Sequence, residues 1–194
     1  MANIKSTGDR LPPRTWSTVA GKDLTVPADA PITHIQFRRF AGCPICNLHL
    51  HTFISRRAEL AEAGIHEVVV FHSTRQQLLE YESELPFDVI PDPDKRLYRE
   101  FGVESSKWAI LAPRVWGTIV RAVARSALRV LRRQSPLPPL NPGGGRYGLP
   151  ADFVVGSDGR LIGVHYGTHA DDQLSIDQVL AMARSAGSTT PPRS

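Results

Sequence analysis

The stretch "FRRFAGCPICNLHL", residues 37–50, holds both cysteines of the 194-residue chain, Cys43 and Cys46. The segment before them, "THIQFRRF" at 33–40, is rich in β-branched and aromatic residues and predicts a strand. From Pro44 onward the apolar residues recur at helical spacing. The cysteine pair is therefore expected between the end of a strand and the first turn of a helix.

A structural disulfide is the first of three explanations for such a pair. The composition, 41% hydrophobic and 22% charged, is enough to build a core without a covalent staple. A bridge across two residues would also remove almost no chain entropy. The chain has neither an apolar leader at its N-terminus nor a run of about 18 apolar residues, so we expect a cytoplasmic protein, in which lasting disulfides are uncommon.

A metal site is the second explanation, because His49 and His51 follow the cysteines closely. Helical residues advance by about 100° each, which turns His51 away from Cys46, and the chain has no second C-x-x-C motif to complete a tetrahedral site. The segment "HYGTHADD" contains further ligand types at His165, His169, Asp171 and Asp172. We interpret them as polar residues of a loop that caps a helix, and we expect neither a metal nor a cofactor.

A redox pair is the third explanation. Cys43 would take the N-cap or first position of the helix, where Pro44 has its φ fixed for a first turn. Unpaired N–H groups and the helix dipole would then favour the Cys43 thiolate, with help from Arg38 or Arg39, of which only one can face the motif. Cys46, one turn further on, could attack the oxidised sulfur. This chemistry requires a pair that is open to solvent at a helix start.

The rest of the chain alternates between helices and strands. The first helix is expected to run from Pro44 to about Ala63, with Gly64 as its stop. Strands are predicted for "HEVVVFHS" (66–73) and "FDVIPDPD" (87–94), and "ADFVVGSDGRLIGVHYG" (151–167) predicts a β-hairpin. Further helices are predicted at 73–85, with a capping box at Ser73 or Thr74, from Pro93 to near Gly102, capped by Asp92, and from Ser175, with Gln178 three residues later.

This order predicts an α/β fold, a thioredoxin-like three-layer sandwich with a mixed central sheet and a helical insertion before the C-terminal hairpin. We expect an irregular N-terminal lead-in over 1–30, with one short strand near "TWSTVAG", and a thioredoxin-like domain over 31–187. The insertion covers 105–149, and residues 188–194 are expected to form a disordered tail.

The insertion contains a basic amphipathic helix at 114–133, so the positive excess behind the net charge of +4 is partly local. Arginines at 121, 125, 129 and 132 occupy one face, and Ile119, Val123, Ala127 and Val130 occupy another. We expect the apolar face to pack on the domain; contact with a membrane or a partner is the alternative. No motif indicates nucleic acid. The loop 135–148 leads into Pro150 and is expected near the active site.

The motifs "GCPIC", "LPADFVVGSDGRLIGVHYG" and "HADD" together resemble the peroxiredoxin-like proteins of the alkyl hydroperoxide reductase/thiol-specific antioxidant group, in the thioredoxin superfamily. The resemblance covers about residues 30–185. It implies that Cys43 attacks, that Cys46 resolves and that Pro150 is a cis-proline packed against them. Phe40, Gly42, Pro44 and Pro150 would line the substrate site.

The chain departs from the peroxiredoxin pattern Pro-x-x-x-Thr/Ser-x-x-Cys, because Gln36 and Phe40 stand at its first two positions. The arginine usual before the late strand is replaced by Pro150, with Arg146 nearest. The sequence therefore leaves two functions open: peroxide reduction in an antioxidant role, and disulfide reduction or redox relay. Either would draw electrons from a thioredoxin-type or low-molecular-weight thiol reductant. A binding role without catalysis is a third possibility.

Overall fold

The structure is a computed structural model that describes residues 4–103 and 148–187, together with seven residues between 117 and 128. Its centre is a five-stranded mixed sheet in the order β5-β4-β3-β6-β7. The strands are β3 (Ile32–Arg38), β4 (Ile65–Phe71), β5 (Asp88–Pro91), β6 (Ala151–Gly156) and β7 (Leu161–Tyr166). β3, β4 and β5 run parallel, whereas β6 runs antiparallel to both β3 and β7. The mixed sheet predicted from the sequence is confirmed.

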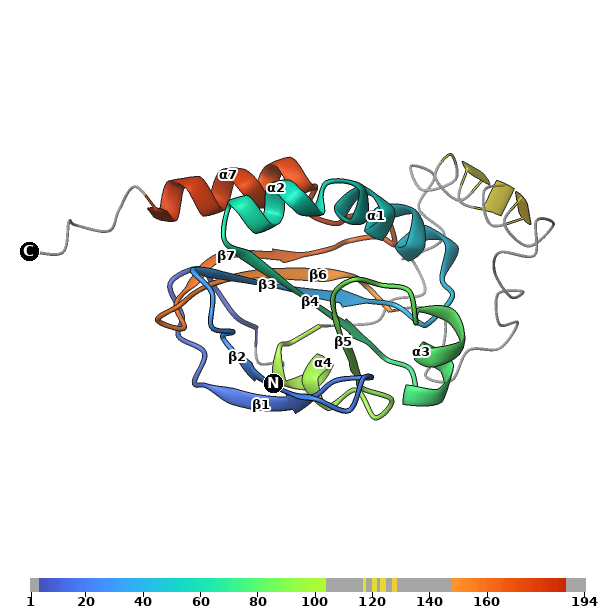
Figure 1. The fold of residues 1–194 in the computed structure, drawn as a ribbon, viewed down its shortest axis with the longest axis horizontal. Coiled ribbons are helices and arrows are strands. Elements are labelled where there is room, and N and C mark those ends of the chain that lie inside the picture. The colour runs from blue at the N-terminus through green and yellow to red at the C-terminus, as the bar shows by residue number, and fades with distance from the viewer. Residues whose placement is uncertain are drawn as a thin grey trace, which may run out of the picture.

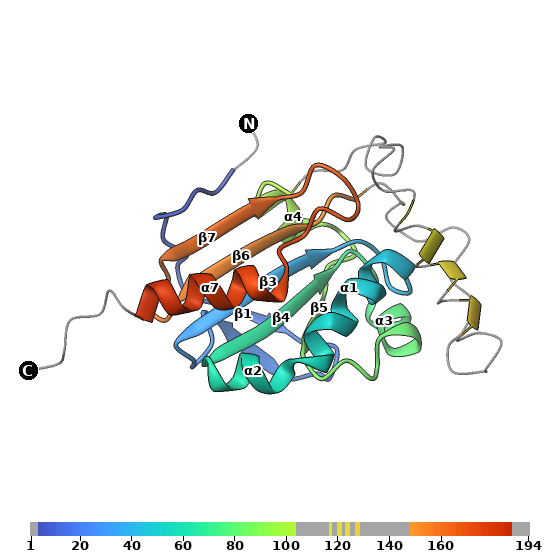
Figure 2. The same cartoon turned by 90° about the horizontal axis from the view of Figure 1, so that it is seen from above.

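Helices and a small hairpin cover the two faces of this sheet (Figure 1). α1 (Pro44–Ser55), α2 (Arg57–Glu62) and α7 (Ile176–Gly187) lie on one face. α4 (Arg96–Glu100) and the antiparallel pair β1 (Arg14–Ser17) and β2 (Asp23–Val26) lie on the other. α3 (Arg75–Tyr81) sits beside α1 at the β5 side of the sheet, as Figure 2 shows from above. The three-layer thioredoxin-like sandwich is thus confirmed.

Alternation along β3 divides its side chains between the two layers. Ile35 and Phe37 join the hydrophobic core on the β1–β2 side, which includes Trp16, Phe101 and Phe153. Successive side chains of a strand point to opposite faces, so the polar residues between them lie on the side of α1. All seven residues of β3 are buried, because both faces are covered.

The helix expected over 44–63 is divided into α1 and α2 at Arg56, which has φ −117° and ψ 23°. The Arg56 guanidinium binds Glu59 at 2.7 Å and Asp177 of α7 at 2.7 Å, and these contacts hold the chain where it changes direction. Gly64 ends the segment as expected, with φ +67°, and an added Cβ would meet the Pro31 ring at 2.9 Å.

The N-terminus of α4 differs from the prediction by three residues. The Asp92 carboxylate does accept from helical N–H groups, those of Arg96 and Leu97, at 2.9 and 2.8 Å. However, Pro93 lies in a turn and Lys95 has φ +54°, so the helix begins at Arg96 rather than at Pro93. The carboxylate reaches over this extra turn to the first free N–H groups.

Three further elements agree with the sequence. α3 begins with a capping box between Thr74 and Gln77. The hairpin of β6 and β7 is present, and α7 follows Ser175, whose Oγ accepts from the N–H of Gln178 at 3.3 Å.

The first 30 residues contain two strands where one was expected, and they pack on the domain. Trp16 of β1 meets Phe101 edge-on with the ring centroids 6.0 Å apart. The backbone N–H of Gly8 donates to the Leu161 carbonyl at 2.8 Å, which places the chain along β7. This segment therefore closes the core below the sheet.

Most of the insertion and all of 188–194 lie outside the described residues, as does Arg146. Gly117, Val120, Arg121, Val123, Ala124, Ala127 and Leu128 are helical, in agreement with the predicted helix. We expected the apolar face of this helix to pack on the domain. Val120 and Val123 are instead 65% and 53% exposed, and Ala127 is also exposed, so that expectation is wrong for these residues. No helix among the described residues is long and apolar enough to cross a membrane.

Candidate active site

Cys43 is the N-cap residue of α1 and follows a short turn after the end of β3 at Arg38. Its backbone is extended, with φ −65° and ψ 116°, and Pro44 begins the helix. The Cys43 carbonyl accepts from the N–H of Asn47 at 3.0 Å, which closes the first turn. The N–H groups of Ile45 and Cys46 are then free to face the Cys43 sulfur. The predicted position at a helix start is confirmed.

The two sulfurs have opposite acidities. Burial alone would raise the pKa of Cys43, but the Cys46 thiol, the Arg39 guanidinium and the N–H groups of Cys46 and Ile45 together lower that pKa to about 6. Arg39 Nη1 lies 3.7 Å from Cys43 Sγ. Burial and the neighbouring Cys43 sulfur raise the pKa of Cys46 well above its ordinary value. At neutral pH Cys43 is therefore a thiolate and Cys46 remains a protonated thiol.

Both cysteines are buried, at 1% exposure each, so the expectation of a solvent-accessible pair is wrong. They form a cluster with Phe40, Ile45 and Ala170. Phe40 precedes the motif and Ile45 lies within it, whereas Ala170 comes from the loop after β7. A substrate must therefore displace part of this cover before it can reach either sulfur.

Side chains of the β4–α3 region hold the turn that carries the cysteines. The Ala41 N–H donates to Ser73 Oγ at 2.9 Å, and the Gly42 N–H donates to Glu82 Oε1 at 2.8 Å. With its side-chain amide oriented to satisfy its hydrogen bonds, Asn47 donates to the same Glu82 oxygen at 3.0 Å. Gly42 has φ +75°, a conformation that favours glycine, and its N–H is not available to a substrate.

Phe40 stands where the resembling family has a hydroxyl, and its side chain is buried in the cluster with the two cysteines. The Arg39 guanidinium carbon lies 5.4 Å from the Phe40 ring centroid, and the His72 ring lies 6.5 Å from it. A Cβ added at Gly148 would lie 3.0 Å from His72 Nε2 and 3.8 Å from Arg39 Cγ. The last residue of the loop 135–148 therefore lies beside Arg39 and His72, at the candidate active site.

Pro150 is a strand-start residue without the cis bond that the resemblance implies. Within the described residues the cis peptide bond is Val26–Pro27, so Leu149–Pro150 is trans. The Pro150 carbonyl accepts from the N–H of Gly167 at 2.9 Å. The Pro150 carbonyl thereby fixes the start of the loop after β7, and the expectation of a cis peptide bond at Pro150 is wrong.

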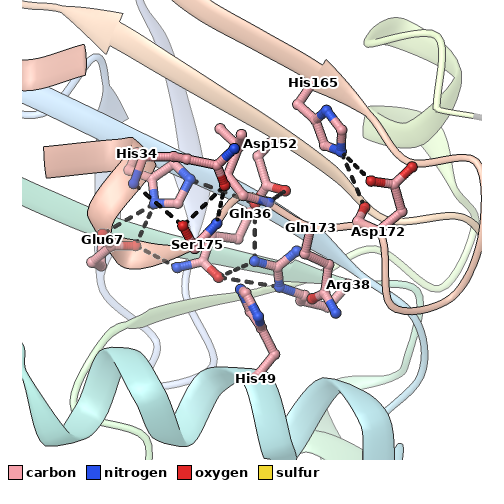
Figure 3. Close-up of polar contacts among 12 residues, drawn as sticks. His34, Gln36, Arg38, His49, Glu67, Asp152, His165, Asp172, Gln173 and Ser175 are labelled. Atoms are coloured by element: carbon pink, nitrogen blue, oxygen red, sulfur yellow. Dashed lines mark hydrogen bonds and ion pairs between the residues drawn. The ribbon is translucent and has the colours of Figure 1, made fainter. Parts of the chain in front are cut away.

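Beneath α1 the sheet carries a network of buried charges (Figure 3). Arg38 Nη2 donates to Asp152 Oδ1 at 2.9 Å and also binds the Gln36 side chain. His34 Nδ1 lies 2.9 Å from Glu67 Oε2, and its Nε2 lies 3.5 Å from Asp152 Oδ1. Arg38 thus faces α1 and this network, while Arg39 faces Cys43, so only one of the two arginines serves the motif, as predicted.

Pairing determines the protonation of the network. Burial opposes a charge on His34, but Glu67 and Asp152 outweigh it and raise the pKa of His34 to about 9. Burial also disfavours the Asp152 carboxylate, yet Arg38 and His34 lower its pKa. Burial and then the Arg38 charge lower the pKa of His49, which reaches the network from α1, to about 3. The network is thereby charge-balanced, with His49 neutral.

Sequence reasoning identified none of these network residues as a cluster. The available signal was the alternation of His34, Gln36 and Arg38 in a predicted strand that is followed by a predicted helix. Among the residues that the structure describes, no group of three side chains could hold a metal ion. Of the polar residues in "HYGTHADD", His165 and Asp172 pair with each other at 2.9 Å.

The fold, with Cys43 at a helix start, is that of a thiol-dependent oxidoreductase of the thioredoxin superfamily. The family model described as AhpC/TSA antioxidant enzyme matches residues 52–169, more than half of the chain, and the chain belongs to this family. The matched region begins after both cysteines, so the roles of Cys43 and Cys46 depend on the geometry given above. No curated protein matches the sequence.

Solved structures with a similar fold include peroxiredoxins and a disulfide-exchange protein. Peroxidoxin BcpB from Mycobacterium tuberculosis has a TM-score of 0.64 at 16% identity, covering 92% of this chain and 96% of that one. A cysteine-to-serine mutant of the peroxiredoxin 6 of Arenicola marina has a TM-score of 0.67 at 12% identity, with 94% and 74% covered. A putative thiol:disulfide interchange protein DsbE from Chlorobium tepidum has a TM-score of 0.57 at 15% identity, with 92% and 98% covered.

Proposed function

We propose that the protein reduces small peroxides through an attacking Cys43 and a resolving Cys46. The observation that supports this most is the acidity of Cys43, whose pKa of about 6 makes it a thiolate at neutral pH. Burial of the pair at 1% exposure favours a small substrate over a protein, because a peroxide needs only a narrow opening.

The proposed reaction begins when the Cys43 thiolate attacks one peroxide oxygen. The O–O bond breaks, Cys43 becomes a sulfenic acid, and the second oxygen takes a proton and leaves as water or an alcohol. Cys46 then forms a bond to the Cys43 sulfur, and its proton leaves with the hydroxyl as water. A thioredoxin-type or low-molecular-weight thiol supplies two electrons and two protons to reopen the disulfide.

Arg39 and the helix N-terminus supply the positive charge that the reaction needs. The Nη1 group of Arg39, 3.7 Å from Cys43 Sγ, can also stabilise the negative charge that develops on the leaving oxygen. Phe40 and Pro44 would line the approach, whereas Gly42 and Pro150 position neighbouring backbone. This assignment gives Arg39 the place that a hydroxyl and a later arginine hold in the peroxiredoxin pattern.

The test is turnover of hydrogen peroxide and of an alkyl hydroperoxide by the full chain, coupled to NADPH through thioredoxin and thioredoxin reductase. Wild type should consume NADPH in proportion to enzyme, and Cys43→Ser should not. Consumption equal to that of Cys43→Ser with both peroxides would refute peroxidase function.

Disulfide exchange is a second candidate, favoured by one observation. Phe40 offers no hydrogen bond to a peroxide, while an acidic and a weakly acidic cysteine in C-x-x-C suffice for exchange with a disulfide. A Cys46→Ser variant that traps a mixed disulfide with a protein substrate, together with insulin reduction by wild type, would support this function over peroxide reduction.

A further inference from the structure

The loop over residues 167–174 covers the cysteine pair. Ala170, at its centre, has no exposed surface and packs in the cluster with Cys43 and Cys46. The other buried side chains of that cluster, Phe40 and Ile45, belong to the segment that bears the cysteines. Within the described part of this cluster, Ala170 is therefore the member that can withdraw without disturbing the motif itself.

Both ends of this loop are fixed to the sheet. At the first, the Gly167 N–H donates to the Pro150 carbonyl at 2.9 Å. An added Cβ at Gly167 would clash with the Asp172 carbonyl oxygen, so the loop closes tightly on itself there. At the second end, the Leu174 N–H donates to Asp152 Oδ2 at 3.1 Å, which joins the loop to the buried charge network.

A latch formed by the Asp172 carboxylate holds the middle of the loop. Oδ2 accepts from the Thr168 N–H at 2.7 Å and from the Thr168 hydroxyl at 2.8 Å. Oδ1 lies 2.9 Å from His165 Nε2 on β7, a contact that Figure 3 shows. Thr168 is exposed, and Asp172 and His165 are half-buried. Water can therefore replace these bonds without unfolding the sheet beneath, as in local opening of a loop.

We infer that residues 167–174 form a gate, latched by Asp172, that determines which substrates reach Cys43. Closed, the gate covers both sulfurs; opened by withdrawal of Ala170, it admits small peroxides and excludes folded protein substrates. Loop and motif are far apart in the sequence, so access can change while the groups that ionise Cys43 stay in place. This inference rests on the proposed role of Cys43 as the attacking thiol.

The test separates access to Cys43 from its acidity. The reduced full chain is alkylated with iodoacetamide and with a maleimide on a polyethylene glycol chain, across a series of pH values, and mass spectrometry locates the label on Cys43. The plateau of the rate reports access, and the midpoint reports the Cys43 pKa. Wild type should react far faster with iodoacetamide than with the bulky reagent.

Asp172→Ala should raise the plateau of the alkylation rate for both reagents, and for the bulky reagent by about tenfold, because charge-assisted hydrogen bonds hold the latch. The midpoint should not move. Gly167→Ala, whose Cβ would clash with the Asp172 carbonyl inside the loop and with Pro150, should act in the same direction. Asp94→Ala is the matched control, because Asp94 is an exposed acid paired with Arg96 at 3.3 Å, outside the loop.

Global unfolding is distinguished by repeating the alkylation at low urea, where loop opening changes little and unfolding rises steeply. If Asp172→Ala does not fold, Thr168→Val removes one latch hydrogen bond and serves in its place. Unchanged plateaus in the folded latch variants and in Gly167→Ala, or an equal rise in Asp94→Ala, would overturn the gate. Because the readout is alkylation, a lack of peroxide turnover would reject the proposed function and leave this result intact.

Discussion

Replacing Arg39 by methionine should raise the pKa of Cys43 by about 1.5 units. At the observed 3.7 Å between Arg39 Nη1 and Cys43 Sγ, two unit charges attract by about 4 kcal/mol in a medium of effective dielectric constant about 20. The guanidinium spreads its charge over three nitrogens, which reduces the effect to about 2 kcal/mol, or about 1.5 pKa units. The Cys46 thiol and the helix N–H groups remain to stabilise the thiolate.

The assay is the pH dependence of alkylation by iodoacetamide, with the label located on Cys43. The midpoint should move from about 6 in wild type to about 7.5 in Arg39→Met, and the rate at pH 7 should fall about fourfold. Arg39→Lys keeps the charge and should hold the midpoint within about half a unit of wild type. A folded Arg39→Met protein with the wild-type midpoint would refute the role given to Arg39.

Three further predictions follow from the same contacts. Cys46→Ser keeps a hydroxyl to donate to Cys43 but removes the resolving sulfur, so peroxide should leave a Cys43 sulfenic acid that dimedone labels, whereas wild type gives a disulfide and little label. Glu82→Ala should lower the free energy of unfolding by about 2–3 kcal/mol in urea titrations, because Gly42 and Asn47 lose a buried acceptor. Glu82→Gln keeps one acceptor oxygen and should lower the free energy of unfolding less. Equal losses in the two variants would contradict a hydrogen-bonding role for Glu82. In Cys43→Ser, the free energy of unfolding should fall by about 3 kcal/mol from pH 6.5 to pH 9, because the raised pKa of His34 stabilises the fold below pH 6.5 and that contribution is lost as the pH passes 9. In wild type the lowered pKa of Cys43 adds stability as the pH rises through the same range, so the decline should be smaller. An equal decline in both proteins would contradict the lowered pKa of Cys43.

The local features of the active site could be predicted because they depend on neighbouring residues. Cys43 follows a strand and directly precedes Pro44, whose fixed φ suits the first position of a helix. These neighbours make Cys43 the N-cap residue, next to the free N–H groups of the first turn. Strand alternation likewise places Arg38 and Arg39 on different sides. The capping boxes at Thr74 and Ser175 are also local, and both form.

The features that could not be predicted join distant segments. Burial of Cys43 and Cys46 involves Ala170, which lies more than 100 residues away and has no distinctive side chain. The charge network joins β3, β4 and β6, and an isolated His34 or Asp152 carries no sign of its partner. The trans bond at Pro150 shows the limit of resemblance, since the same sequence position can hold either isomer.

The measurement that tests the central claim most directly is the rate of oxidation of the reduced full chain by hydrogen peroxide as a function of pH, with the product identified by mass spectrometry. A Cys43 thiolate held by Arg39 and the start of α1 predicts a rate that follows a pKa of about 6 and a product with a Cys43–Cys46 disulfide. A rate that follows the ordinary pKa of free cysteine, about 8.5, or oxidation that leaves the two sulfurs unlinked, would contradict it.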